Sequence, residues 1–373
     1  MARNILKIST LALMAAASTL SAAHAGGFAR GTADTDILYE DGSFNIRAGA
    51  TVIAPTRKFV KAFAPLGGSL VGKSAYDTYV LPSAALKLNI NDDLRCATTY
   101  NQSFGGDTSY AVPFGTLAKL SENLAVDEFG LTCGYKMGLS TGQAWLLGGI
   151  AQNNISYGLV AGGGSRVFSL NDTKTSFRVG AAYEIPEFAL RVQAMYVSGY
   201  KINASGTALV LPANVTLPAT GAGEVPQSFE IKAQSGIAPD WLAFGSVKWT
   251  DWSVTKQLIL TSAAIGGSRA NNYFYRDGWT VNGGVGHKFS DNFSGAVSIT
   301  WDRGTGTGYD TASDTWTVGA GGALKDKLGG ELKFGAGITY IAGASETKYA
   351  APLNTVVKSG VAYAFGASYK TKW

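Results

Sequence analysis

The C-terminal segment Val356 to Trp373 reads V-V-K-S-G-V-A-Y-A-F-G-A-S-Y-K-T-K-W and alternates in polarity. Apolar and aromatic side chains share the odd positions: Val357, Val361, Tyr363, Phe365, Ala367, Tyr369 and Trp373. Lys358, Lys370 and Lys372 share the other parity. Because successive side chains of a strand point to opposite faces, this pattern predicts a strand with one apolar face. Alternating aromatics before a terminal aromatic are typical of the signal for outer-membrane assembly.

The same alternation recurs along the chain, clearly in Phe188 to Val197, Asn292 to Asp302 and Glu331 to Tyr340. Short turns of Asn, Asp, Pro and Ser separate such segments, and longer Gly-, Ser- and Thr-rich connections alternate with them. This asymmetry is typical of bacterial outer-membrane barrels. We predict an all-β fold, a transmembrane antiparallel β-barrel of about fourteen strands. The strands are expected near 44–56, 77–90, 94–104, 124–136, 143–157, 174–184, 188–203, 227–238, 241–260, 273–288, 292–303, 315–324, 329–346 and 356–373.

Composition agrees with a barrel. Glycine accounts for 48 of 373 residues and charged residues for only 15%, against the roughly 25% charged residues of soluble domains. In a membrane barrel, outward side chains contact lipid and small inward ones leave a lumen. The formal net charge of +5 is small and dispersed, so we expect no nucleic-acid partner.

The N-terminus predicts two further segments. Arg3 and Lys7 precede an apolar run, and Ala23-His24-Ala25 has small residues where a signal peptidase cleaves. Residues 1–25 are therefore interpreted as a secretory signal peptide. Residues 26–43 are polar and acidic and precede the barrel at 44–373; they form either a periplasmic tail or a plug inside the barrel.

Three features resemble the FadL family of outer-membrane transporters of hydrophobic compounds. They are the segment Ser246 to Ser253 with its two Trp, the segment Tyr275-Arg276-Asp277-Gly278-Trp279 that opens the next strand, and the strand that ends at Asp302 before a long loop. Their order along the chain also agrees with the family.

The resemblance implies a fourteen-stranded barrel with an N-terminal hatch in the lumen. Its ligand would be a long-chain fatty acid, the first choice, or another hydrophobic molecule such as an aromatic hydrocarbon, which crosses by passive diffusion and leaves sideways at a kinked third strand. The implied hatch residues are Phe28, Arg30, Asp34, Asp36, Glu40 and Asp41. The implied lateral opening comprises Asn101, Gln102, Ser103, Phe104, Gly105 and Gly106, although the Gly pair is equally expected at the start of an external loop.

Charged residues supply the candidates for ligand binding. For most of them, a structural role in ion pairs across the barrel interior is the simpler explanation. Parity places ten charged residues inside the barrel: Arg178, Glu184, Arg191, Glu230, Lys232, Lys248, Arg276, Asp302, Glu331 and Lys333. The family has a basic residue at the inner pocket where Arg276 stands here, so Arg276 is the main candidate to bind a polar head group. Arg191 and Lys248 are the other candidates.

Two departures from the family bear on the ligand. Asp41-Gly42-Ser43-Phe44 stands where the hatch usually carries Asn-Pro-Ala. The loop after the fifth strand, long in the best-known members, is expected to be only Gly158 to Thr173.

Catalysis is not expected. His287 is the one histidine left after signal cleavage, and its parity places it at a membrane interface. Asp92-Asp93 reads as a turn, and Gly319 to Gly322 is followed by no helix, so it is no dinucleotide loop. We therefore expect no enzyme activity, cofactor or metal site.

The alternative functions are a general diffusion porin and a structural or adhesive barrel. Expected partners are outer-membrane lipid, lipopolysaccharide and the barrel assembly machinery, with the chain a monomer.

The two cysteines lie on neighbouring predicted strands. Cys96 follows a short turn, and Cys133 lies near the same end of the next strand, both with outward parity. We expect the two residues to be cross-strand neighbours. An oxidising periplasm favours a disulfide between them, with two free thiols as the alternative.

The C-terminal pattern yields a test. Deleting Trp373 should slow insertion into the outer membrane, because the terminal aromatic belongs to the recognised segment. Pulse-labelling followed by fractionation should show more periplasmic aggregate. Undiminished insertion would show that the aromatic pattern serves another purpose.

Overall fold

The computed structural model describes residues 27–327 and 329–372, so the predicted signal peptide and Trp373 lie outside the described residues. The main sheet has 18 strand segments. Four transmembrane strands are interrupted and contribute two segments each, which leaves fourteen transmembrane strands. All pairings are antiparallel, and β1 pairs with both β3 and β21, which closes the barrel. The predicted fold class and strand number are confirmed.

Ten transmembrane strands are continuous: β1 (Phe44–Pro55), β3 (Tyr79–Asn89), β4 (Leu94–Phe114), β5 (Lys119–Leu139), β6 (Gly142–Ala161), β7 (Arg166–Ile185), β16 (Phe293–Arg303), β17 (Thr315–Lys325), β18 (Glu331–Ile341) and β21 (Gly360–Lys372). Four are interrupted: β8 (Leu190–Val197) with β9 (Tyr200–Val210), β10 (Val215–Val225) with β11 (Ser228–Ala238), β12 (Trp241–Thr250) with β13 (Gln257–Ser262), and β14 (Gly267–Asn272) with β15 (Gly278–Lys288).

Short elements decorate the barrel. β2 (Phe59–Lys61), β19 (Ala344–Ser345) and β20 (Val356–Val357) form a small separate sheet over the end with the longer loops. The 3-10 helices in the described part of the chain are η1 (Thr35–Tyr39), η2 (Gly162–Gly164), η3 (Pro186–Phe188), η4 (Trp252–Val254) and η5 (Ala263–Ile265). None of the helices in the described part of the chain has the length and hydropathy to cross a membrane.

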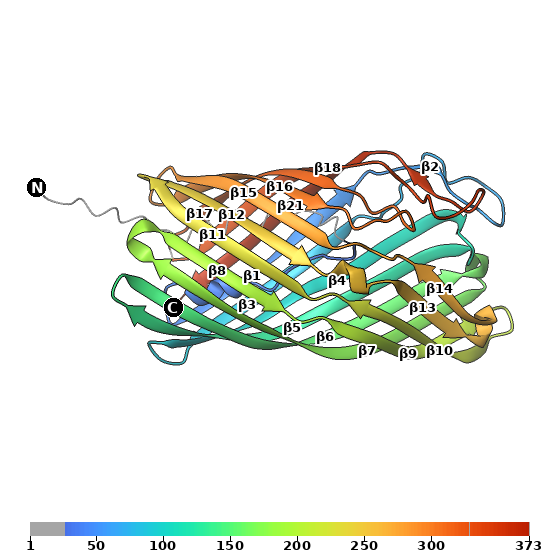
Figure 1. Cartoon of the computed structure of the whole chain (residues 1–373), viewed down its shortest axis with the longest axis horizontal. Coiled ribbons are helices and arrows are strands. Elements are labelled where there is room, and N and C mark those ends of the chain that lie inside the picture. The colour runs from blue at the N-terminus through green and yellow to red at the C-terminus, as the bar shows by residue number, and fades with distance from the viewer. Residues whose placement is uncertain (1–26, 328, 373) are drawn as a thin grey trace, which may run out of the picture.

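The two ends of the barrel differ in their connections. β1 begins beside the end of β21, with Asn45 opposite Lys372, at the end that carries the short turns (Figure 1). We assign this end to the periplasm, as the turn lengths predict. Alternation holds in the last strand: Tyr363, Phe365 and Tyr369 are exposed, whereas Ala362, Ala364 and Lys370 are buried inside.

The predicted strand ranges were too short in the middle of the chain. The expected loop Gly158 to Thr173 is wrong: β6 and β7 continue to a tight turn at Gly162–Gly164. β10 was missed altogether and pairs with β9 in a second long hairpin. In these extensions the polarity of the two faces is opposite to that of the membrane-spanning part of the same strands. Tyr157 and Leu170 are buried inside, while Ser156 and Asn171 are exposed outside. The pattern of apolar side chains on the outer face therefore ends at the membrane boundary, whereas the strands continue beyond it.

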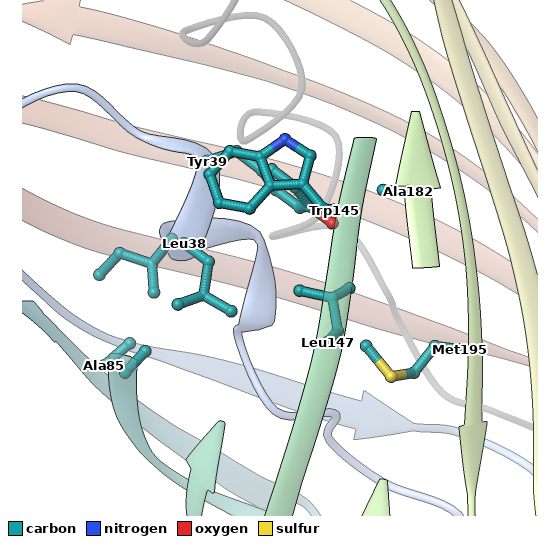
Figure 2. Packing of buried hydrophobic residues seen from close by; sticks show 9 residues of the cluster. Leu38, Tyr39, Ala85, Trp145, Leu147, Ala182 and Met195 are labelled. Atoms are coloured by element: carbon teal, nitrogen blue, oxygen red, sulfur yellow. The ribbon is translucent and has the colours of Figure 1, made fainter. Parts of the chain in front are cut away.

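The N-terminal segment 27–43 packs against inward-facing side chains of the barrel. Ile37 and Leu38 are fully buried, in a cluster with Ala85, Trp145 and Met195 from three different strands (Figure 2). The Tyr39 ring meets the Trp145 ring edge-on, with centroids 5.2 Å apart. Apolar packing of this kind accompanies a segment that occupies the lumen.

Charges attach the same segment to the wall. Glu40, 3% exposed, pairs with Arg47 and with Lys370, whose Nζ lies 2.7 Å from Oε2, and Lys333 Nζ lies 3.9 Å from Oε1. Asp34 also pairs with Arg47 at 2.5 Å, and Asp36 with Lys232 at 3.6 Å. Asp41 is exposed, and its backbone carbonyl accepts a hydrogen bond from the Asn45 amide. Glu40 thus lies against three wall cations, Arg47, Lys333 and Lys370, whose charge it shares with Asp34 and with Glu331 of β18.

A disulfide joins β4 to β5. Cys96 and Cys133 are register partners on the outer face, with their Sγ atoms 2.04 Å apart. The bond lies near the periplasmic end of both strands and fixes the lower part of β4 to its neighbour.

The Glu40 cluster generates a test. Glu40→Gln should loosen segment 27–43, because removing one partner of a buried ion pair leaves uncompensated cations and costs about 3–5 kcal/mol. Limited proteolysis of the detergent-purified protein should then cut within 27–43. The control is Glu187→Gln in an exposed turn. Equal resistance of both variants would mean that apolar packing alone holds the segment.

Candidate ligand-binding pocket

A cavity lies inside the extended upper part of the barrel, where polarity is reversed. Its walls come from β4, β5, β6, β7, β9, β10 and β13, together with η4 and the N-terminal segment. The lining residues are Phe28, Phe104, Leu124, Val126, Ile155, Tyr157, Leu170, Ile202, Ala204, Gly221, Gly223, Glu224, Val225, Pro226, Trp252, Thr255, Gln257, Leu258, Ile259 and Leu260. Nearly all of the lining is apolar, as in most small-molecule sites.

The cavity is small and holds no cation. The volume open to the centre of a water-sized sphere is about 50 Å³, and one such sphere needs about 10–15 Å³, so the free space suits a single ring or a short chain. Among the described residues, the lining includes no Lys, Arg or His side chain. A carboxylate placed here would lose hydration without gaining a charged partner.

Aromatic rings form one side of the cavity. Phe28 of the N-terminal segment stands among Trp252, Tyr273 and Tyr275, with ring centroids 6.4, 5.3 and 6.3 Å from its own. Phe104 of β4 meets Trp252 edge-on at 6.0 Å. Edge-to-face contacts of this kind add stability beyond the area that they bury. Phe28 therefore belongs both to the N-terminal segment and to the pocket wall.

Tyr275 adds a polar but neutral group to this cluster. Its hydroxyl donates to Asp310 at 2.6 Å. Burial raises the pKa of Tyr275 well above its usual range, and the nearby carboxylate acts in the same direction. The phenol stays protonated, so it brings no charge to the pocket side of the cluster.

Local sequence explains the position of Trp252. The residue lies on η4, where the break between β12 and β13 turns the chain inward. Glycines flank the indole: a Cβ at Gly27 would lie 2.9 Å from it, and a Cβ at Gly278 would lie 2.8 Å from it. Either side chain would displace the ring from the pocket wall.

The predicted lateral-opening residues lie at an irregularity of β4. β3 pairs with β4 only from Asn89–Arg95 up to Ser83–Asn101, and β4 bulges against β5 at Ser103. Above Asn101, the free edge of β4 bonds to the N-terminal segment instead: Arg30 N donates to Ser103 O at 3.0 Å, and Gly105 N donates to Phe28 O at 2.8 Å.

The three basic residues predicted to bind ligand lie away from this cavity. Arg191 pairs with Glu184 at 3.2 Å and stacks on the Tyr39 ring at 4.1 Å, so it holds the N-terminal segment. Lys248 stands opposite Glu230 in the strand register. Arg276 is exposed at the external end, where Nε donates to Gly304 O at 2.9 Å and Nη2 lies 3.7 Å from Asp314. The structure thus places Arg276 outside the cavity lining, because the chain between β14 and β15 leaves strand geometry there and parity no longer gives the direction of a side chain. Ligand binding by Arg276 stays a prediction.

Sequence reasoning missed most of the lining. Ile202, Ala204, Gly221 and Leu260 belong to the strand extensions. The signal available was the inverted alternation of such extensions, apolar at odd positions from 155 to 159 and at even positions from 168 to 170. Within the described chain, no group of three or more His, Cys, Asp or Glu side chains is arranged to hold a metal ion.

The barrel is similar to solved structures of outer-membrane proteins. Solved structures that match include a FadL homologue of Pseudomonas aeruginosa (13% identity, TM-score 0.72, covering 90% of this chain and 91% of that chain). The Pseudomonas putida toluene transporter TodX matches with 14% identity and a TM-score of 0.62, covering 95% and 97%. The Ralstonia pickettii toluene transporter TbuX matches with 13% identity and a TM-score of 0.58, covering 99% of each chain. At these identities the likeness concerns the fold.

The sequence comparisons decide the family. No curated protein sequence matches the chain. The family model described as outer membrane protein transport protein (OMPP1/FadL/TodX) matches residues 32–326, most of the chain. The chain therefore belongs to the OMPP1/FadL/TodX family and is an outer-membrane transporter of hydrophobic compounds.

Proposed function

We propose that this protein carries a compact, uncharged hydrophobic molecule, of the aromatic hydrocarbon class, across the outer membrane by passive diffusion. The ligand occupies the apolar cavity and leaves sideways between β3 and β4, while segment 27–43 acts as a hatch. The cavity itself carries this proposal, since its lining is apolar and partly aromatic and, in the described chain, has no basic side chain.

A long-chain fatty acid fits less well than the sequence suggested. Its carboxylate finds no cation in the lining, and burying an unpaired charge costs several kcal/mol or more. Its chain also needs more room than the few water-sized spheres that the cavity admits. Two of the proteins with the same fold are described as toluene transporters, which supports an aromatic ligand.

The residues that fill the lumen favour a plugged barrel rather than an open pore. Segment 27–43 is attached by apolar packing around Ile37 and by the ion pairs of Glu40, both on the lumen side. A general diffusion porin requires a water-filled lumen at this level. The arrangement therefore favours a plugged transporter over the porin alternative.

Filling the cavity tests the ligand proposal. Ala204→Leu adds three carbons at an inward position that is 4% exposed, and it should weaken binding of toluene to the purified protein at least about tenfold by occupying the free space. The control is Ser205→Leu, one residue along β9 and facing outward. Isothermal titration of both variants, with lauric acid as a second ligand, gives the comparison. Tighter binding of lauric acid than of toluene by the unsubstituted protein would overturn the proposed ligand class.

Arg276 offers a second test of the site. Arg276→Ala should leave binding of toluene and of lauric acid within about twofold, because its guanidinium bonds to the loop at Gly304 and Asp314 and not to the cavity. Selective loss of lauric acid binding would restore Arg276 as a ligand contact.

A further inference from the structure

The wall between β3 and β4 contains a window. Below it the strands pair as far as Ser83 and Asn101. Above it they meet again, where Asp77 N donates to Asp107 O at 3.3 Å. Between these points lie residues 102–106 of β4, which is roughly 16 Å of strand at about 3.3 Å per residue. In the described chain, no β3 residue is a register partner of this stretch.

The N-terminal segment takes the place of β3 along this stretch. Ala29 forms an antiparallel bridge with Phe104. Gly31 N donates to Gln102 O at 2.8 Å, which extends the pairing made by Arg30 and Phe28. Backbone groups of Gln102, Ser103 and Gly105 on the free edge of β4 thereby find hydrogen-bond partners.

Arg30 then spans the window from one strand to the other. Its guanidinium carbon lies 3.4 Å from the centre of the Tyr79 ring of β3. On the other side, Nη2 lies 3.0 Å from Asp107 Oδ2, and Nε donates to Gly105 O at 3.2 Å, both on β4. The residue is 7% exposed.

The two glycines of β4 make room for this arrangement. A Cβ at Gly105 would lie 3.3 Å from Arg30 Nε, and a Cβ at Gly106 would lie 3.4 Å from the Phe28 ring. Phe28 and Arg30 therefore rest side by side on β4, the first against the cavity and the second against the window. The absence of side chains at Gly105 and Gly106 leaves the space that Arg30 and Phe28 occupy.

We propose that Arg30 is the latch of this window, a positioning residue that closes the wall by joining Tyr79 of β3 to Asp107 of β4. The inference rests on the lateral exit proposed above. A planar guanidinium suits the task, because one face stacks on a ring while the edge bonds to a carboxylate and a carbonyl. Exit of the ligand requires these contacts to break, so their strength sets how often the wall opens.

The test measures exit separately from binding. The protein is reconstituted in vesicles of brominated phosphatidylcholine, loaded with naphthalene as the neutral probe, and naphthalene fluorescence is followed by stopped flow as the lipid bromine quenches it. Arg30→Met keeps the length of the side chain and removes the charge. Exit should become about tenfold faster, as expected for loss of charge-assisted bonds, while equilibrium binding of naphthalene in detergent stays within about twofold.

Two variants complete the design. Arg269→Met, an exposed arginine of β14, should leave exit unchanged. Tyr79→Leu removes the stacking partner without altering the N-terminal segment and should speed exit about threefold, which keeps the test available if Arg30→Met does not fold.

The outcomes separate the latch from the exit route. An exit rate in Arg30→Met and Tyr79→Leu equal to that of the unsubstituted protein, or slower, overturns the latch. If bound naphthalene reaches the vesicle interior without meeting brominated lipid, the lateral exit is wrong, and the latch fails with it for that separate reason. If Ala204→Leu does not weaken binding, the ligand does not occupy the proposed cavity, which is a separate failure from that of the latch.

Discussion

Every backbone N–H and C=O group at membrane depth must find a partner within the protein, because lipid supplies none. The closure of β1 onto β21 meets this requirement around the circumference. Where β3 ceases to pair with β4, along residues 102–106 of β4, Phe28 to Gly31 bond to the exposed edge. The bonds to this edge hold the N-terminal segment in place, and Phe28 of the same segment lines the cavity.

Polarity divides the barrel into two levels. In the lower strands, apolar side chains face lipid and the lumen holds charges, so segment 27–43 is anchored by Glu40 and its three cations. In the upper extensions of β4 to β10, outward side chains are polar and inward ones apolar, as in a soluble barrel. The apolar cavity lies at the upper level, whereas ion pairs occupy the lower lumen.

The N-terminal segment contacts both levels. Glu40 and Ile37 bind it to the charged and apolar parts of the lower lumen, while Phe28 stands in the aromatic wall of the cavity and Arg30 lies in the window. A movement confined to Phe28 and Arg30 would change the cavity and the window together and leave Glu40 and Ile37 in place.

The sequence by itself determined the barrel, its strand number and the outward face of most strands. Contact with lipid imposes apolar side chains at alternate positions, and this pattern is local, so Phe293 to Trp301 or Tyr363 to Tyr369 reveal it without any partner. The outward parity and shared height of Cys96 and Cys133 were readable for the same reason. The family resemblance added the idea of a hatch and of an irregular third strand.

Only the tertiary structure decided the ends of β6 and β7, the existence of β10 and the lining of the cavity. Outside the membrane the alternation reverses, so a rule based on lipid contact reads those strands as loops. Arg276 shows a second limit: where a chain leaves strand geometry, parity no longer tells which way a side chain points. The contacts of Arg30 with Tyr79 and Asp107 join residues 49 and 77 positions away. No local pattern encodes such contacts, since they arise from where β3 ceases to pair with β4.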